Sequence, residues 1–246
     1  MLTLIQPQPV ARFAQTSVTE QVEETAAFAM KIRGVTVARG PAGIGKSSTV
    51  AKLLADEALG AKGFEIPATG GSNSRLLRYV ATALEMPFWD MPSFGAMIER
   101  ISDGRNSVPC LIVDEVQNAA ANGLRMLLSL NERAGLPIVL VGNMAALKRT
   151  SSNAAAFDQI EDRITKFYDL EKTSQTDIAA VAKEWGVNDA MSMKIVLAYG
   201  KDKSLRTVSK FLQLARQSLA ADDRLNPDLL KQALQYLAPG LADARR

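Results

Sequence analysis

Residues 40–47 are Gly40-Pro41-Ala42-Gly43-Ile44-Gly45-Lys46-Ser47 and match the pattern G-x-x-x-x-G-K-[S/T] at every constrained position. The run Val35–Arg39 before them predicts a buried strand. The segment Ser47–Leu59 after them predicts a helix that Gly60 would end. A glycine-rich loop between a strand and a helix is the setting in which this pattern binds phosphate. The alternative is an ordinary glycine-rich turn, and the context on both sides favours the phosphate loop.

The residue types of this loop suit a nucleoside triphosphate. Glycines let the backbone curl so that successive N–H groups point at phosphate oxygens, and the helix N-terminus adds the positive end of its dipole. Lys46 would reach the β- and γ-phosphates, and the Ser47 hydroxyl would help to hold Mg²⁺. We therefore expect nucleotide contacts from residues 40–47 and from the following Ser48.

The composition is that of an ordinary globular protein, with 246 residues, 47% hydrophobic and 22% charged. A formal net charge of +3 is compatible with nucleic-acid binding without requiring it. Apolar runs are far shorter than the roughly 18 residues of a membrane span, and the N-terminus lacks the features of a secretory signal. We therefore expect no membrane association and a cytoplasmic location.

Histidine is absent from the sequence, and Cys110 is its single cysteine. The absence of histidine excludes Ser-His-Asp and Cys-His catalysis and zinc sites built on imidazole. Cys110 cannot form an internal disulfide, and its position at the start of an apolar run predicts a small buried side chain. Chemistry must come from carboxylates, lysine, arginine and bound metal.

Four further apolar runs predict strands, and helical stretches separate them. This alternation is typical of βαβ units with a parallel sheet. A capping-box pattern at Ser17-Val-Thr-Glu20 predicts an N-terminal helix that ends before Gly34. The predicted strands are Gly63–Thr69, Cys110–Val113, Pro137–Val141 and Phe167–Leu170, and the predicted helices run from residues 72 or 74 to 84, from 94 to 101 and from 122 to 134.

The pattern changes after Leu170, because no further strand is predicted. Ser174-x-x-Asp177 predicts a capped helix that ends near Gly186, and more helices are predicted over residues 190–198, 204–220 and 227–237. We therefore expect an extended lead-in over residues 1–15, an α/β nucleotide-binding domain over 16–171 and a small all-helical lid over 172–246.

Two acids end the predicted strand that begins at Cys110. Asp114 could bind a water that coordinates Mg²⁺, and Glu115 could orient and polarise an attacking water. A small-molecule kinase needs the first acid but has less use for the second, because its nucleophile is the substrate. The pair therefore favours hydrolysis, and the alternative is two solvated acids at a strand end.

Three other polar residues are candidates for the same site. Asn143 ends the next buried strand and could bridge the γ-phosphate and the water, although Gly-Asn is also a common turn. Arg163 could reach a neighbouring subunit's γ-phosphate as an arginine finger, or form a surface salt bridge with Asp162 or Glu161. Arg206 could fold from the lid onto the phosphates of its own subunit, or remain a solvated side chain.

The order of these features resembles that of AAA+ ATPases, which have a P-loop core with a mostly parallel sheet and a helical lid. Within that class the chain resembles the family of phage Mu transposition protein B and the helper ATPases of transposons and insertion sequences. The resemblance covers nearly the whole chain. It is carried by VTVARGPAGIGKSS, LIVDEVQNAA, GLPIVLVGNMAAL, AFDQIEDRITKFYDLEKTSQTDIAAVAKEWGV, SLRTVSKFLQLARQSL and LNPDLLKQAL.

The resemblance implies an ATP- and Mg²⁺-dependent ATPase that assembles as a filament or ring on double-stranded DNA. It would recruit a transposase to target DNA, in a bacterial cell or a phage-infected host. By analogy the site within one subunit would comprise Lys46, Ser47, Asp114, Glu115 and Asn143, with Arg206 as the lid contact and Arg163 as the contact to the next subunit. The Mu protein has an additional N-terminal helix-turn-helix domain, so we expect DNA binding here from the ATPase body and the lid.

Other functions remain open at this point. One alternative is a helicase loader or another replication or repair helper ATPase, which only the partner would distinguish. A second is a binding module that binds ATP but hydrolyses it with negligible turnover. A third is a small-molecule kinase. Glu115, Asn143 and the helical lid argue against the kinase.

DNA binding without sequence preference requires lysine and arginine side chains that contact the phosphate backbone. The segment 194–216 is the most basic of the chain, with six basic residues and one acid, Asp202. It could instead be a solvated face or the site that docks the transposase. The candidate DNA contacts are Arg75, Arg78, Lys148, Arg149, Lys201, Lys203 and Lys210.

Overall fold

The computed structural model of the protein describes residues 12–69, 71–86, 93–104, 108–143, 154–217 and 224–237, with side chains omitted over 154–157. Residue contacts divide the chain into two units. The first comprises Gln21–Gly40 and Lys46–Leu170. The second comprises Val10–Glu20, Pro41–Gly45 and Glu171–Arg246, each as far as it is described.

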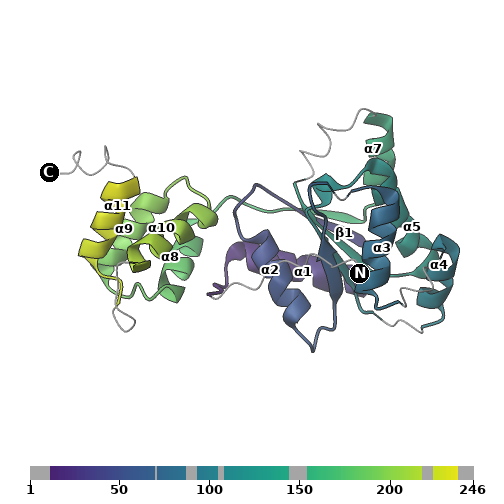
Figure 1. Cartoon of the computed structure of the whole chain (residues 1–246), viewed down its shortest axis with the longest axis horizontal. Coiled ribbons are helices and arrows are strands. Elements are labelled where there is room, and N and C mark those ends of the chain that lie inside the picture. The colour runs from purple at the N-terminus through teal and green to yellow at the C-terminus, as the bar shows by residue number, and fades with distance from the viewer. Residues whose placement is uncertain are drawn as a thin grey trace. The chain divides into compact units, whose positions relative to one another are not determined.

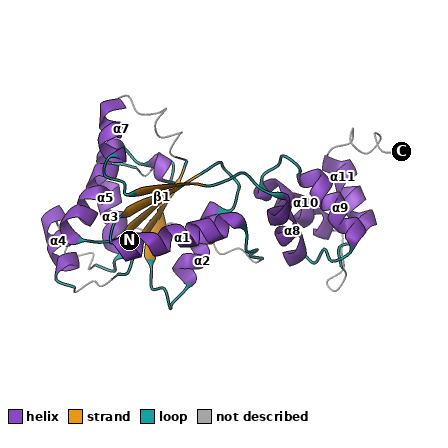
Figure 2. Ribbon diagram, turned by 180° about the vertical axis from the view of Figure 1, so that it is seen from behind, coloured by secondary structure: helices purple, strands orange, loops and turns teal. Residues whose placement is uncertain are grey.

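A parallel sheet of five strands forms the centre of the first unit, in the order β2-β3-β4-β1-β5 (Figure 2). Every residue of β3 and β4 is buried, as expected for central parallel strands covered on both faces. Because every strand pairing is parallel, the carboxyl ends of the strands meet at one edge of the sheet. The strands are β1 Val35–Arg39, β2 Lys62–Glu65, β3 Leu111–Asp114, β4 Ile138–Gly142 and β5 Lys166–Asp169.

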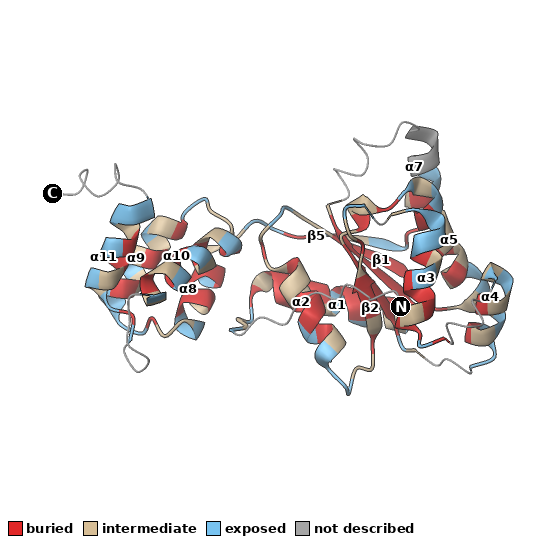
Figure 3. Cartoon of the chain, in the orientation of Figure 1, coloured by how far each residue is buried: buried red, intermediate tan, exposed pale blue. Residues whose placement is uncertain are grey.

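Helices cover both faces of this sheet, which confirms the predicted α/β fold class. Figure 1 shows α1 (Ser17–Ile32) and α2 (Lys46–Ala55) on one face and the remaining helices of the unit on the other. The apolar strand residues and the inner faces of these helices form the core, which is red in Figure 3. The remaining helices are α3 Asn73–Ala83, α4 Phe94–Ser102, α5 Ala121–Ala134 and α7 Ala154–Glu161.

Helix α2 ends at Ala55, four residues before the end predicted from the sequence. The side chain of Asp56 explains the difference, because its Oδ1 accepts hydrogen bonds from the backbone N of Ala58 at 3.0 Å and of Leu59 at 3.3 Å. An aspartate that binds the following N–H groups competes with the helical hydrogen bonds. Gly60 then takes a positive φ of 62°, as a chain-reversing glycine does.

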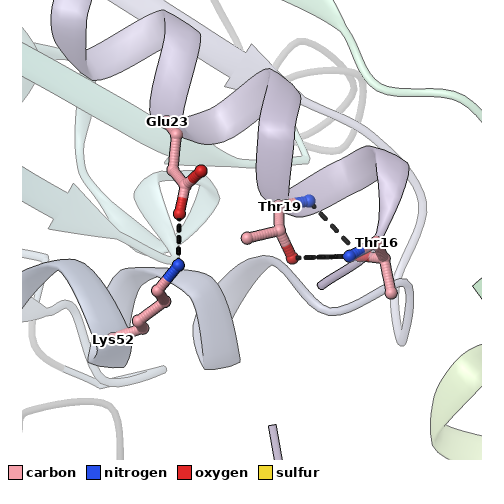
Figure 4. A network of polar contacts seen from close by, with 4 residues as sticks. All are labelled: Thr16, Thr19, Glu23 and Lys52. Atoms are coloured by element: carbon pink, nitrogen blue, oxygen red, sulfur yellow. Dashed lines mark hydrogen bonds and ion pairs between the residues drawn. The ribbon is translucent and has the colours of Figure 1, made fainter. Parts of the chain in front are cut away.

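The capping box of α1 lies one residue earlier than predicted. Thr16 and Thr19 form reciprocal bonds, with each backbone N donating to the other's Oγ1 at 3.3 Å (Figure 4). Ser17 instead donates to Asp177 through its backbone N and its hydroxyl. Further along α1, within the first unit, Glu23 pairs with Lys52 of α2 at 2.5 Å (Figure 4).

Four helices form the lid part of the second unit. Helix α8 begins with the predicted capping box of Ser174 and Asp177, in which the Ser174 hydroxyl accepts from the Asp177 N at 3.1 Å. The four helices enclose a separate apolar core that includes Phe211 and Leu212. They are α8 Gln175–Glu184, α9 Ala190–Gly200, α10 Leu205–Gln217 and α11 Pro227–Leu237. In the described ranges, every helix is too short or too polar to cross a lipid bilayer.

Candidate nucleotide site

The glycines of the phosphate loop have the backbone conformation that such a loop requires. Gly43 and Gly45 take positive φ values of 79° and 109°, which side chains with a Cβ rarely adopt. Within the second unit, the Gly43 carbonyl accepts a hydrogen bond from the backbone N of Arg206 at 3.0 Å. A Cβ on Gly43 would lie 2.9 Å from the Ser204 hydroxyl oxygen. The loop therefore packs closely against the start of α10, where the candidate Arg206 lies.

Lys46 begins α2 and is buried, with 8% of its surface exposed. Its Nζ donates to the Gly40 carbonyl at 3.0 Å, while the Gly40 N donates to the carbonyl of Gly142 at 3.2 Å. The Lys46 ammonium group is thus held beside Gly40, the first residue of the phosphate loop. Gly40 in turn is bonded to the carboxyl end of β4.

Asp114 is the last residue of β3 and is fully buried. Burial raises the pKa of its carboxyl group, although the Ser47 hydroxyl, the Glu115 backbone N–H and the charge of Lys46 oppose the rise. Its Oδ1 accepts from the Glu115 N at 2.8 Å. Its Oδ2 is buried without a hydrogen-bond partner among the described residues. A buried carboxylate oxygen without a partner is costly, so it indicates a ligand that the site is built to receive.

Mg²⁺ fits these donors. The cation binds oxygen ligands, keeps several waters, and is held in nucleotide sites by one or two protein oxygens and the substrate phosphates. Asp114 and the Ser47 hydroxyl would supply those protein oxygens. No group of three or more acidic or cysteine side chains suited to a metal occurs in the described part of the chain. Bound there, Mg²⁺ would neutralise the charge that develops on the phosphates.

Glu115 lies just beyond β3 in the left-handed backbone conformation, with a φ of 55° and a ψ of 40°. This conformation is uncommon for a residue with a side chain and often marks a functional position. The Asp114 carboxylate fixes the Glu115 N, and the Glu115 carbonyl accepts from the Asn118 N at 2.9 Å. The Glu115 side chain accepts a short hydrogen bond from Gln117 Nε2.

Gln117 also reaches the end of the neighbouring strand. Its Oε1 accepts a hydrogen bond from the backbone N of Asn143 at 2.8 Å. A Cβ on Gly142 would lie only 2.4 Å from that oxygen, so the glycine permits the close approach. The structure thus joins the predicted residues Glu115 and Asn143 through a residue that the sequence did not single out.

Sequence reasoning also missed Glu65 and Asn118. Glu65 ends β2 opposite Asp114. Burial raises the pKa of Glu65, and the charges of Asp114 and Glu115 raise it further. Asn118 Nδ2 donates to the Ile66 carbonyl at 2.8 Å, which ties the segment after β3 to the end of β2. Gln117 and Asn118 lie within four residues of Asp114 in the sequence, and that closeness was the available signal. Glu65 had no such signal, because its place opposite Asp114 depends on strand register.

Arg163 lies between α7 and β5, and its Nε pairs with Glu132 of α5 at 3.4 Å. Both side chains are close to half exposed. The contact lies within one subunit and does not bear on a contact with a neighbour.

The candidate DNA contacts fall in both units. Arg75 and Arg78 are exposed on α3, and Arg75 donates to the Thr69 carbonyl. Lys148 and Arg149 lie outside the described residues. In the lid, Lys201 and Lys210 are exposed, and the Lys203 ammonium lies 5.2 Å from the centre of the Tyr199 ring. The two described groups therefore belong to different units.

A parallel sheet in this strand order, a phosphate loop after β1 and an Asp-Glu pair at the end of β3 give this chain the P-loop fold of AAA+ ATPases. In agreement, residues 30–150 match the family model described as an AAA domain. A solved structure of the Aeropyrum pernix ORC2 protein, in ADPNP–ADP complexes, shares the fold. It has a TM-score of 0.67 at 18% sequence identity, covering 92% of this chain and 69% of that chain.

Within this class, the chain resembles phage Mu transposition protein B. Residues 162–237 match the family model described as Mu B transposition protein, C terminal. The chain is 25% identical to the ATP-dependent target DNA activator B of Escherichia phage Mu over 237 residues, covering 94% of this chain and 75% of that relative. The protein of the same name from Escherichia phage D108 matches with the same identity and coverage.

Proposed function

We propose that this ATPase binds double-stranded DNA in its ATP-bound state, assembles on it, and recruits or activates a transposase for target selection. The observation that carries the proposal is the similarity over 94% of the chain to proteins named ATP-dependent target DNA activator B. The match of residues 162–237 to the Mu B C-terminal family supports it, because it extends the likeness beyond the common ATPase core.

The described edge of the sheet supplies groups for ATP hydrolysis. Lys46 binds the β- and γ-phosphates, and Ser47 and Asp114 hold Mg²⁺. Glu115 orients the attacking water and accepts its proton, while Asn143 lies between that water and the γ-phosphate. The backbone N–H groups of residues 40–48 bind the phosphate oxygens.

Two arginines would complete the site. Arg206 contacts the phosphates from the lid, and the hydrogen bond from its backbone N to the Gly43 carbonyl, within the second unit, supports this role. Arg163 acts on the ATP of a neighbouring subunit in a filament or ring, after exchanging its exposed pairing with Glu132 for the phosphate. An arginine supplied in this way is worth roughly a thousandfold or more in rate.

DNA contacts come from basic side chains on both units. Arg75 and Arg78 of α3 and Lys201, Lys203 and Lys210 of the lid bind the phosphate backbone without reading bases. Replacement of one such lysine by alanine is expected to weaken binding to all sequences similarly and to reduce the slope of log affinity against log salt by about 1.

The test is binding to duplex DNA at one fixed salt concentration with ATP, ADP or no nucleotide, followed by imaging of the complexes. The proposal expects tight binding and filaments or rings with ATP only. Lys46→Ala is expected to lose ATP binding and assembly together. Lys52→Ala is the matched control, because Lys52 lies on the same helix but pairs with Glu23 outside the site. DNA binding that is indifferent to nucleotide would contradict the proposal.

A helicase loader or another replication helper is the second candidate function, since the same ATPase core would serve it. A pull-down with ATP and DNA separates the two. Recovery of a transposase supports target selection, and recovery of a replicative helicase in its place would replace it with the loader function.

A further inference from the structure

We infer that Gln117 is a positioning residue for ATP hydrolysis, which holds the Glu115 carboxylate and ties it to the carboxyl end of β4 at Asn143. The inference rests on the role proposed above for Glu115. Gln117 would act through Glu115 rather than on the nucleotide itself.

The side-chain amide of Gln117 is used at both ends. Its Nε2 donates to Glu115 Oε2, and its Oε1 accepts from the Asn143 N at 2.8 Å. A carboxylate only accepts hydrogen bonds and a backbone N–H only donates, so the partners themselves fix which way the amide faces. One side chain thus connects the two residues proposed to handle the attacking water.

The surrounding backbone is shaped for this connection. A Cβ on Gly142 would lie 2.4 Å from Gln117 Oε1 and 3.0 Å from the Val116 N. The absence of a side chain on Gly142 therefore leaves the space that Gln117 Oε1 occupies. On the other side, the Asn118 side chain holds the Ile66 carbonyl at 2.8 Å, which anchors the segment Val116–Asn118 to β2. Gln117 therefore projects from a segment that is fixed at both flanks.

Glu115 needs such a restraint more than a strand residue would. It follows the last residue of β3, has the left-handed backbone conformation and is only partly buried. A glutamate side chain with these freedoms populates several rotamers. A hydrogen bond to its charged carboxylate selects one of them. The same amide also bonds the backbone N of Asn143. If Asn143 moved when it contacted the γ-phosphate, Gln117 would therefore transmit that movement to the Glu115 carboxylate.

The competing explanation is that Gln117 only fastens the loop to β4. Gln117→Glu separates the two roles, because the variant is nearly isosteric and keeps an acceptor for the Asn143 N. It loses the donor to Glu115 and places a second carboxylate beside it. Gln117→Ala removes both bonds. Asn131→Ala is the control, since it also removes a side-chain amide, whose Nδ2 donates to the backbone carbonyls of Arg33 and Leu136, away from Glu115 and Asn143.

The experiment measures kcat, KM and ATP affinity for the three variants with DNA present. We expect Gln117→Ala and Gln117→Glu to lower kcat about tenfold to a hundredfold, as misplaced catalytic groups do, with KM and ATP affinity near the wild type. Asn131→Ala is expected to keep kcat. A wild-type kcat in Gln117→Glu would mean that Gln117 only ties its loop to the end of β4 and does not position Glu115. A raised kcat in Gln117→Ala would show that the amide holds Glu115 in an idle orientation, and either result overturns the inference.

A double mutant separates this inference from the proposed function. Glu115→Gln combined with Gln117→Glu is expected to turn over no more slowly than Glu115→Gln alone, because the residue that Gln117 positions has already lost its charge. Wild-type turnover by Glu115→Gln would remove the proposed role of Glu115. Loss of turnover in Glu115→Gln, with normal kcat in both Gln117 variants, would remove only the role of Gln117.

Discussion

Two buried aspartates, one in each unit, have opposite environments. Asp114 at the end of β3 is fully buried, and one of its oxygens has no hydrogen-bond partner among the described residues. Asp177 in α8 is 3% exposed and accepts four hydrogen bonds, two from Ser17 and two from Ser174, at 2.7–3.0 Å. Burial raises the pKa of Asp114. At Asp177 burial acts in the same direction, but the hydrogen bonds outweigh it and the pKa is lowered.

The difference is the one expected between a carboxylate that binds a ligand, as proposed for Asp114, and one used for structure. Asp177 is satisfied within the protein and fixes the start of α1 to the start of α8 in the second unit. Asp114 Oδ2 has no partner among the described residues, which fits a carboxylate that accepts a ligand. Functional sites commonly carry a cost in stability.

Asp114→Asn should produce the largest effect. The variant keeps the shape of the side chain but loses the charge that would hold Mg²⁺, so ATP turnover should fall at least about a hundredfold. Steady-state turnover with saturating Mg²⁺ and ATP measures this. Turnover within a few-fold of the wild type would mean that Asp114 is merely a buried acid at a strand end.

Asp177→Ala should lower stability. It leaves the backbone N–H groups of Ser17 and Ser174 without their acceptor and removes the Asp177 half of the α8 capping box, which together cost about 3 kcal/mol of unfolding free energy. Urea unfolding measures the loss. Asp189→Ala is the control, because Asp189 caps α9 by accepting from the Ser192 N at 2.8 Å but does not join two segments. Asp189→Ala should lower the unfolding free energy less than Asp177→Ala does. Equal losses would mean that Asp177 contributes no more than an ordinary helix cap.

The two aspartates should give opposite pH dependences. A lowered folded-state pKa means that the contribution of Asp177 is present above its unfolded value, about 3.9, and is lost as pH falls through the folded value. The wild type should therefore lose its advantage over Asp177→Ala in acid. A raised pKa at Asp114 means that its cost is present at neutral pH and shrinks as pH falls. Unfolding curves at a series of pH values test both signs.

Asp114→Asn should also stabilise the nucleotide-free protein slightly, by about 1 kcal/mol at neutral pH, because a neutral amide is cheaper to bury than a carboxylate. Thermal unfolding without nucleotide measures the gain. A lower melting temperature would show that the Asp114 charge supports the fold and would break the comparison with Asp177.

Arg163→Ala should have the smallest effect on the folded chain. Its pairing with Glu132 at 3.4 Å is exposed, so its loss should change the unfolding free energy by less than about 1 kcal/mol. Turnover should fall only in the assembled state. Mixing Arg163→Ala with Lys46→Ala should restore turnover where an intact site meets an intact arginine. Absence of that rescue would place the arginine outside any shared site.

Local patterns predicted much of this structure. The phosphate loop, the strands around it and the Ser174–Asp177 capping box depend on neighbouring residues and lie where the sequence indicates. The capping box of α1 was wrong because Ser17 binds Asp177, which is 160 residues away. A short-range pattern carries no information about such a partner.

The missed parts of the site have the same cause. Gln117 matters because β4 lies beside β3 and Gly142 leaves space for it, and Glu65 because β2 places it opposite Asp114. Strand order and register bring these residues together, and neither follows from the separate runs of sequence. The early end of α2 is different, because Asp56 is local and an aspartate's tendency to bind the following N–H groups could have predicted it.

The central claim is that the unsatisfied Asp114 is kept for Mg²⁺ and ATP. It is tested most directly by the melting temperatures of the wild type and Asp114→Asn, each with ATP alone and with ATP plus Mg²⁺. We predict that Mg²⁺ markedly raises the melting temperature of the wild type in the presence of ATP. Asp114→Asn should have the higher melting temperature with ATP alone but gain little when Mg²⁺ is added. An equal Mg²⁺-dependent gain in both proteins would contradict the claim.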